Sequence, residues 1–294
     1  MQAEHGWTEQ EGSEESTCGS CGSPLGDAEQ NCLTCGAYVS SPNVRAAKQK
    51  GALQALQQRY LAALRQAKEN GLADHQLTAF EACMAQTRAV INMELEDLRY
   101  FVVKRDRVYS TYQLCVDGEI RKPSTGRLDR HRVMVEGALF GTYAPRIRYA
   151  ALTLDGSGCQ GYGPFALTLR DAAVKIRSTV LEENSYMFWK RHADRLTAGK
   201  APLGYMATWH DRGRLAVAKL GKHLSPTTKA SDYQGLLLRT NDDRSQEEFI
   251  EVHIYGPFDI SAVDEIRVRR SMLDHPDITV IKEKLPKDTK WTEE

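Results

Sequence analysis

Residues 249–255 read Phe-Ile-Glu-Val-His-Ile-Tyr, and this stretch predicts a β-strand with one buried face. Successive side chains of a strand point to opposite faces, so every second residue shares a face. The predicted core face consists of Ile250, Val252 and Ile254. Glu251 and His253 then share the opposite face, which is either a solvated surface or the wall of a cleft. A carboxylate that faces inward loses its hydration, so Glu251 would need a partner or a function there.

The segments around this strand predict a mixed α+β domain. Runs of β-branched and aromatic residues predict further strands at residues 108–116, 147–154, 165–169 and 264–269. Residues 129–140 predict a short helix that Gly141 closes, and clusters of Gly and Pro separate the strands. Because helices do not alternate regularly with these strands, an α+β fold is expected and not a doubly wound parallel sheet.

Residues 41–103 predict an antiparallel helical hairpin, because they are rich in good helix formers. Apolar residues recur at steps of three and four over residues 53–67, and Gly71 signals a C-terminal cap. A second stripe over residues 80–102 follows a capping box at residues 78–81. This hairpin either connects two parts of the chain or presents a coiled-coil surface to a partner.

Two Cys-x-x-Cys pairs, ten residues apart, lie near the N-terminus: Cys18, Cys21, Cys32 and Cys35. This spacing supplies four thiolates to one tetrahedral Zn²⁺. Gly22 and Gly36 follow the second cysteine of each pair, where a tight knuckle turn needs a positive φ. A zinc ion with four protein ligands has no open position for substrate, so a structural role is expected. A redox dithiol or a pair of disulfides are the alternatives.

Residues 1–40 are thus expected to form a zinc ribbon with a disordered acidic N-terminus. The chain has 39 basic and 39 acidic residues, and residues 18–40 contain no Lys or Arg. This balance lacks the basic surface that duplex binding demands, so the ribbon is expected to dock a protein or aid folding, with nucleic-acid contact second. The polar opening and the lack of a long apolar stretch predict a cytoplasmic protein without membrane contact. Cys83, Cys115 and Cys159 are then unpaired thiols.

Four segments, in chain order, resemble ADP-ribosyltransferase-like domains and, more narrowly, an uncharacterised bacterial family of that type. They are Gly-Ala-Leu-Phe-Gly-Thr-Tyr at residues 137–143, Arg-Ile-Arg-Tyr-Ala-Ala-Leu-Thr-Leu at 146–154, residues 161–185, and Phe-Ile-Glu-Val-His-Ile-Tyr-Gly at 249–256. The likeness covers about residues 105–272. It implies an ADP-ribosyltransferase-like split β-sandwich with flanking helices over residues 104–294.

The resemblance also implies an activity, which is NAD-dependent transfer of ADP-ribose to a macromolecular acceptor, either protein or nucleic acid. Such an enzyme would suit a bacterial toxin or a defence effector. The alternative is a non-catalytic interaction module, in which the ribbon and hairpin recruit a partner and the NAD cleft is vestigial.

The residue roles follow from the same resemblance. Cleavage of the bond to nicotinamide builds positive charge on the ribose, and Glu251 matches the glutamate that stabilises this charge. Tyr149 matches the aromatic residue that packs on nicotinamide, and an ordinary strand tyrosine is the alternative. Ser185 matches a polar position after a strand, with a helix N-cap as the alternative.

The predicted first strand lacks the Arg or His that such transferases use to hold NAD. Gln113 matches a polar position there, and Arg148 is a further candidate for binding NAD, as are Arg107 and Arg146.

Two charged stretches are expected to be exposed. Glu247 and Glu248 belong to the charged run 242–248 and are predicted loop carboxylates. Residues 190–222 are basic and are predicted to be a solvated, mostly helical insertion that touches a protein or nucleic-acid target.

Overall fold

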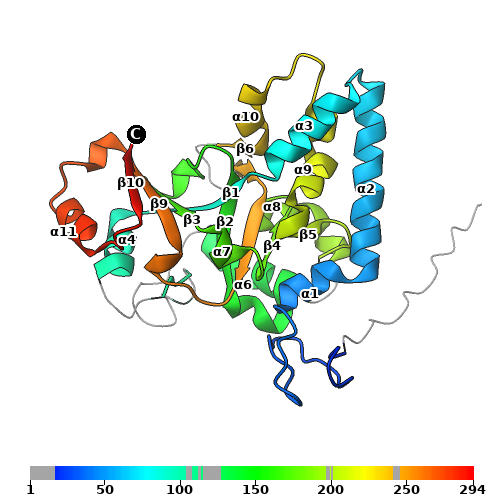
Figure 1. Ribbon diagram of the computed structural model, residues 1–294, viewed down its shortest axis with the longest axis horizontal. Coiled ribbons are helices and arrows are strands. Elements are labelled where there is room, and N and C mark those ends of the chain that lie inside the picture. The colour runs from blue at the N-terminus through cyan, green and yellow to red at the C-terminus, as the bar shows by residue number, and fades with distance from the viewer. Residues whose placement is uncertain are drawn as a thin grey trace, which may run out of the picture.

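The computed structural model describes residues 17–103, 108–111, 114, 127–196, 199, 201–240 and 246–294, without the side chains of residues 127–130 (Figure 1). Within these residues the centre is an eight-stranded sheet of order β10-β9-β3-β1-β2-β8-β4-β5, and β6 and β7 form a separate pair. The β9–β10 pair is parallel, and the other neighbours are antiparallel. The predicted mixed α+β class is confirmed.

The strands are β1 Arg88–Met93, β2 Ile147–Thr153, β3 Phe165–Leu169, β4 Ser178–Leu181, β5 Met206–Thr208, β6 Leu238–Arg239, β7 Glu248–Phe249, β8 Glu251–Tyr255, β9 Val263–Val268 and β10 Lys290–Glu293. The α-helices are α1 Pro42–Lys48, α2 Lys50–Glu69, α3 Asp74–Met84, α4 Leu95–Val103, α6 Arg127–Phe140, α7 Asp171–Val174, α8 Ser185–His192, α9 Arg212–Leu220, α10 Tyr233–Leu237 and α11 Asp277–Lys284.

Most of the predicted strands form where the sequence pattern places them. β2, β3 and β9 match their predicted ranges to within about one residue, and residues 249–255 divide into the end of β7 and all of β8. The strand predicted over 108–116 is not formed by its described residues, because 108–111 lie outside any strand and Leu114 is helical.

Strand β1 corrects the predicted helical hairpin over residues 41–103. The first arm is confirmed as α2, followed by Gly71 at φ +87°. The second arm is wrong, because α3 ends at Met84 and β1 then pairs with both β2 and β3 at the centre of the sheet. The sequence Ala-Val-Ile-Asn-Met is compatible with the periodicity of a helix and with that of a strand. Its pairing with a strand on each side therefore decides its conformation.

The two faces of the sheet are covered by different helices. One face forms the main core with α2, α3, α9, α4 and α11, and in Figure 1 α2 and α9 lie together at one end while α4 and α11 lie at the other. The opposite face, over β2, β8 and β4, packs against α6 and α8. Ile250, Val252 and Ile254 belong to the main core, so the predicted alternation is confirmed.

Gly163 tests the central position of β1. Its φ is +147°, and an added Cβ would lie 2.1 Å from the carbonyl carbon of Met93 at the end of β1. We expect Gly163→Ala to lower the free energy of unfolding by at least about 2 kcal/mol in denaturant titrations, because backbone must move. Gly235→Ala, in α10 with no atom near its Cβ position, is the control and should be neutral or slightly stabilising. Equal stability of both variants would contradict the placement of β1.

Candidate functional site

Glu251 lies on the sheet face covered by α6 and α8. Strand β8 sits between β2 and β4, where the Cα partners of Glu251 are Ala151 and Leu181. Glu251 is only 8% exposed and His253 is 0% exposed. The solvated-surface interpretation of this face is therefore wrong, and Glu251 is an inward-facing carboxylate with partners.

Ser185 holds one oxygen of this carboxylate. Glu251 Oε2 accepts a hydrogen bond from the Ser185 backbone N–H at 2.8 Å and another from the Ser185 hydroxyl. Asn184 is the N-cap of α8, since its side chain accepts from Tyr186 N at 2.9 Å. Ser185 is thus the first residue of the helix and not its N-cap. The positive end of the helix dipole stabilises a negative charge on Glu251.

His253 completes a compact polar group, but its geometry is not that of a hydrolase triad. Its Nε2 lies 3.1 Å from Glu251 Oε2 and 3.3 Å from the Ser185 hydroxyl. A triad would use one ring nitrogen for the serine and the other for the carboxylate. The buried Nδ1 of His253 has no hydrogen-bond partner in the described structure. The arrangement around Ser185 therefore differs from that of a serine-hydrolase triad.

Tyr149 stands beside this group on strand β2. It is the Cα partner of His253, and the two rings meet edge to face with centroids 5.5 Å apart. The structure therefore brings together three of the predicted site residues: Glu251, Ser185 and Tyr149.

Helix α6 adds Glu136 and Arg132, which the sequence analysis missed. Burial raises the pKa of Glu136 to about 7, Arg132 and Tyr149 oppose this rise, and Glu251 adds to it. Burial also raises the pKa of Tyr149 well above its usual value. Arg132 and Glu136 are four residues apart and so share a helical face, which is the signal that could have identified them.

Other predicted residues do not join this group. Arg148 pairs with Ile254 in the register and lies on the opposite face of β2, where its guanidinium donates to the carbonyls of Tyr109 and Pro145. Its predicted place beside bound NAD is not supported by this geometry. Gln113 and Arg107 lie outside the described residues.

The charged stretches are less exposed than expected. Glu247 is 1% exposed and lines an open groove, so its prediction as a surface carboxylate is wrong. Glu248 is half-buried and lies 3.7 Å from both Lys219 and Arg239. Residues 190–222 contain helix, as expected, but α9 within them packs into the main core and is not solvated.

The N-terminal cysteines form a metal-binding group. The ligand atoms of Cys18, Cys21, Cys32 and Cys35 lie within 4.8 Å of one another. The sulfurs of Cys18 and Cys35 are 3.7 Å apart, as are those of Cys21 and Cys32. A tetrahedral zinc site with bonds of about 2.3 Å has S–S edges of about 3.8 Å, so this group fits zinc. The alternative of a pair of disulfides is not seen, because the described cysteines are all free.

The two knuckle turns hold the cysteines in place, and their surroundings shift the pKa values of the thiols. Gly22 and Gly36 have φ of +72° and +73°, as predicted, and each amide donates to the carbonyl of the first cysteine of its pair at 2.8 Å. Hydrogen bonds from Ser23 lower the pKa of Cys21 to about 6. The pKa of Cys35 rises to about 12, because its neighbouring thiols outweigh the lowering effect of the Ala37 N–H. Four adjacent thiolates thus need a cation to be charged together.

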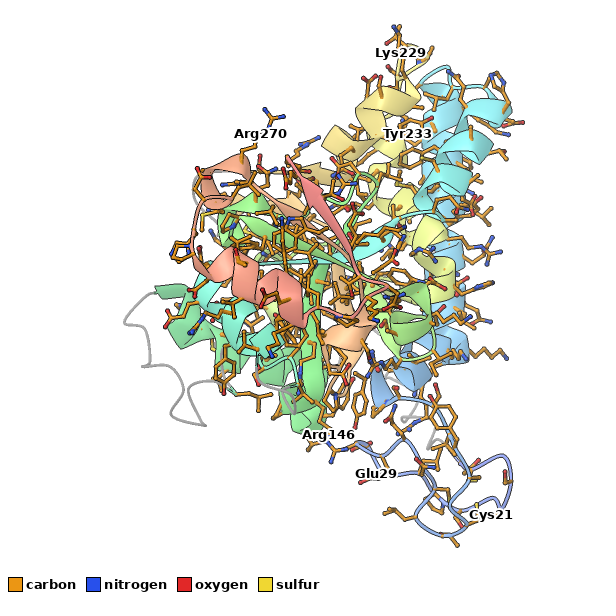
Figure 2. All side chains as sticks on the ribbon, turned by 60° about the vertical axis from the view of Figure 1, so that its left-hand side comes forward. Cys21, Glu29, Arg146, Lys229, Tyr233 and Arg270 are labelled. Carbon is orange, nitrogen blue, oxygen red and sulfur yellow. The ribbon has the colours of Figure 1, made fainter. Side chains whose placement is uncertain are left out.

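The ribbon is hydrogen-bonded to strand β8. Tyr255, four residues beyond Glu251, donates to the Ala28 carbonyl, and Arg146 donates to both Ala28 O and the Tyr255 hydroxyl. Arg45 of α1 donates to the carbonyls of Gly26 and Glu29. Figure 2 shows Glu29 and Arg146 where the ribbon meets the rest of the chain, with Cys21 farther out.

No protein-family model matches this chain, and no curated protein matches it. Within the described residues, the helices are all too short or too polar to cross a membrane.

The metal site predicts one zinc ion per chain by elemental analysis. Joint replacement of Cys18 and Cys32 by Ser should abolish zinc binding, because two of four ligands are lost. Amide hydrogen exchange over residues 17–41 should then rise, since the knuckles lose their cross-link. Cys83→Ser, outside the cluster, is the control and should keep its zinc. Zinc retained by the double variant would refute the site.

Glu136 predicts a pH dependence of stability. Its folded-state pKa of about 7 exceeds the ordinary value of 4.5, so the native state binds this proton more tightly than the unfolded state. Its contribution to stability is complete below about pH 4.5 and is lost as the pH rises to about 7. Relative to Glu136→Gln, the wild-type protein should lose up to about 3 kcal/mol over this range in denaturant titrations.

Glu283→Gln, on the exposed side of α11, is the matched control and should keep the wild-type pH dependence. A parallel pH dependence for the wild type and Glu136→Gln would contradict the buried environment of Glu136.

Proposed function

We propose that this chain is an NAD-dependent ADP-ribosyltransferase whose active site surrounds Glu251. The observation that carries the proposal is the fixed, inward-facing Glu251 carboxylate, bonded through Oε2 to Ser185 N–H at the start of α8. Among the described residues, every hydrogen bond to this carboxylate ends on Oε2. The side chain remains 11% exposed, so Oε1 is the oxygen that the proposal assigns to substrate.

Cleavage of the bond between ribose and nicotinamide is favoured by a negative charge held in a fixed position. The bond between ribose C1′ and the nicotinamide nitrogen breaks, nicotinamide leaves with the bonding pair, and C1′ becomes electron-poor. Glu251, through the 2′-hydroxyl, stabilises that positive charge in the transition state. Because Ser185 and the sheet hold the carboxylate in advance, little reorganisation is needed when the charge develops.

Glu136 is the proposed general base. The acceptor nucleophile forms its bond to C1′ and must lose a proton. A carboxylate with a pKa of about 7 takes up that proton near neutral pH better than an ordinary glutamate would. Tyr149, beside both Glu136 and His253, offers an aromatic wall for nicotinamide.

The zinc ribbon is proposed as a structural element that also docks a protein. Its surface carries Leu33 at 82% exposure and Tyr38 at 55% exposure. These exposed apolar side chains favour contact with a protein. In the transferase, that protein would be the acceptor of ADP-ribose. In the non-catalytic alternative, binding that protein would be the function of the chain.

Labelled NAD tests the proposal. The purified full chain is incubated with NAD labelled in the adenylate and with a lysate that contains protein and nucleic acid, and transferred label is measured. Glu251→Gln keeps size and polarity but removes the charge, so we expect the transfer rate to fall by about 10² or more. Glu283→Gln, an exposed matched control, should leave the rate unchanged.

Two outcomes would contradict the proposal. One is wild-type protein that transfers no label and releases no nicotinamide. The other is transfer that persists in Glu251→Gln at the wild-type rate. Thermal unfolding of both variants separates loss of activity from loss of fold.

A further inference from the structure

The charges of this neutral chain are unevenly distributed over the fold. Residues 42–68, in α1 and α2, contain no Asp or Glu and six basic residues, which are Arg45, Lys48, Lys50, Arg59, Arg65 and Lys68. Residues 277–294, which include α11 and β10, contain four Lys and five Asp or Glu. In Figure 1, α2 and α11 lie at opposite ends of the molecule. The fold therefore gathers positive charge around α2 and leaves a mixed surface at the other end.

The outward side of α2 presents cations and amides to solvent. Its inward side, with Leu56, Ala63 and Ala67, is buried in the main core. The 3-10 helix Gly221–His223 packs beside α2, and its Lys222 is exposed. We call the following exposed residues the basic face: Lys50, Gln54, Gln57, Gln58, Arg65 and Lys222.

The cations of the basic face are not used by the fold. Other basic residues of α2 are already neutralised, since Arg59 pairs with Glu182 and Lys68 lies 2.8 Å from Asp74. Within the described residues, the three cations of the basic face form no ion pair. Lys50 and Arg65 are separated by about 22 Å along the helix axis. A ligand of the basic face therefore carries negative charge along such a length.

We propose that the basic face binds the phosphate backbone of a nucleic-acid duplex. A DNA duplex carries one negative charge per about 1.7 Å of its axis, so it presents charge along the whole distance from Lys50 to Arg65. Lys, Arg and Gln side chains are common donors to phosphate oxygens. Phosphate contacts carry no sequence information, so binding is independent of base sequence. The inference does not rest on the proposed transferase activity.

Other polyanions fit the basic face less well. A helix that lies on a membrane buries its apolar side among the lipids, whereas the apolar side of α2 lies in the core. The exposed leucines of α2 are Leu53 and Leu61, each at only 42% exposure. A single strand favours exposed rings on which its bases stack, whereas the basic face consists of cations and amides.

Fluorescence anisotropy with a labelled DNA duplex of about 20 base pairs tests the basic face on the full chain. We expect the wild type to bind with a Kd in the micromolar range at about 50 mM salt, and more weakly as salt rises. Each lost phosphate contact reduces the slope of log K against log salt by about 0.9. The triple variant Lys50→Gln, Arg65→Gln, Lys222→Gln should therefore show a slope smaller by about 2 to 3.

A second triple variant, Lys284→Gln, Lys287→Gln, Lys290→Gln, is the matched control. These lysines are exposed, and their replacement removes the same charge from the opposite end of the molecule. The control should keep the wild-type affinity and slope. Thermal unfolding of both variants separates loss of binding from loss of fold. If the first triple variant does not fold, Arg65→Gln alone replaces it, with a slope smaller by about 0.9.

Three results would overturn the basic face. They are a wild type that does not bind the duplex at about 50 mM salt, an unchanged slope in the first triple variant, and an equal loss of affinity in the control. Phosphatidylserine vesicles or polyglutamate that bind as tightly as the duplex would also overturn it, in favour of a membrane or an acidic protein. These measurements use no NAD, so their outcome is independent of the transferase proposal.

Discussion

The hydrogen bonds from Ser185 to Glu251 join two elements that the chain keeps far apart, the start of α8 and the middle of the sheet. A buried carboxylate needs partners to offset its lost hydration, and the Ser185 N–H and hydroxyl provide them. The same contact ties the first residue of α8 to strand β8. Helix α6, which carries Glu136, and α8 share one core cluster on this face of the sheet.

Strand β8 serves three parts of the structure at once. Its aliphatic side enters the main core, its polar side carries Glu251 and His253, and its last residue, Tyr255, binds the ribbon through Ala28. Asn43 of α1, directly after the ribbon, donates to the His253 carbonyl at 3.0 Å. Hydrogen bonds from within the ribbon, at Ala28, and from just after it, at Asn43, thus hold the ribbon to the strand that carries the candidate site.

The sequence predicted those features that depend on residues close together in the chain. Alternation placed Glu251 and His253 on one face, and cysteine spacing with two glycines placed the metal group. The sequence could not predict β1, because residues 88–93 become a strand only through pairing on two sides. It also could not show that Glu247 is buried, which depends on tertiary packing, or that Arg148 faces away from Glu251, which depends on how β2 pairs with β8. Glu136 was missed because its perturbed pKa comes from tertiary burial.

A crystal structure of the Glu251→Gln variant with NAD would test the proposed place of Glu251 in the NAD site, because the variant should bind NAD without consuming it. We expect the nicotinamide ribose within hydrogen-bond distance of residue 251, with the nicotinamide against Tyr149. NAD bound elsewhere on the chain, or crystals that remain free of NAD at saturating concentration, would contradict it.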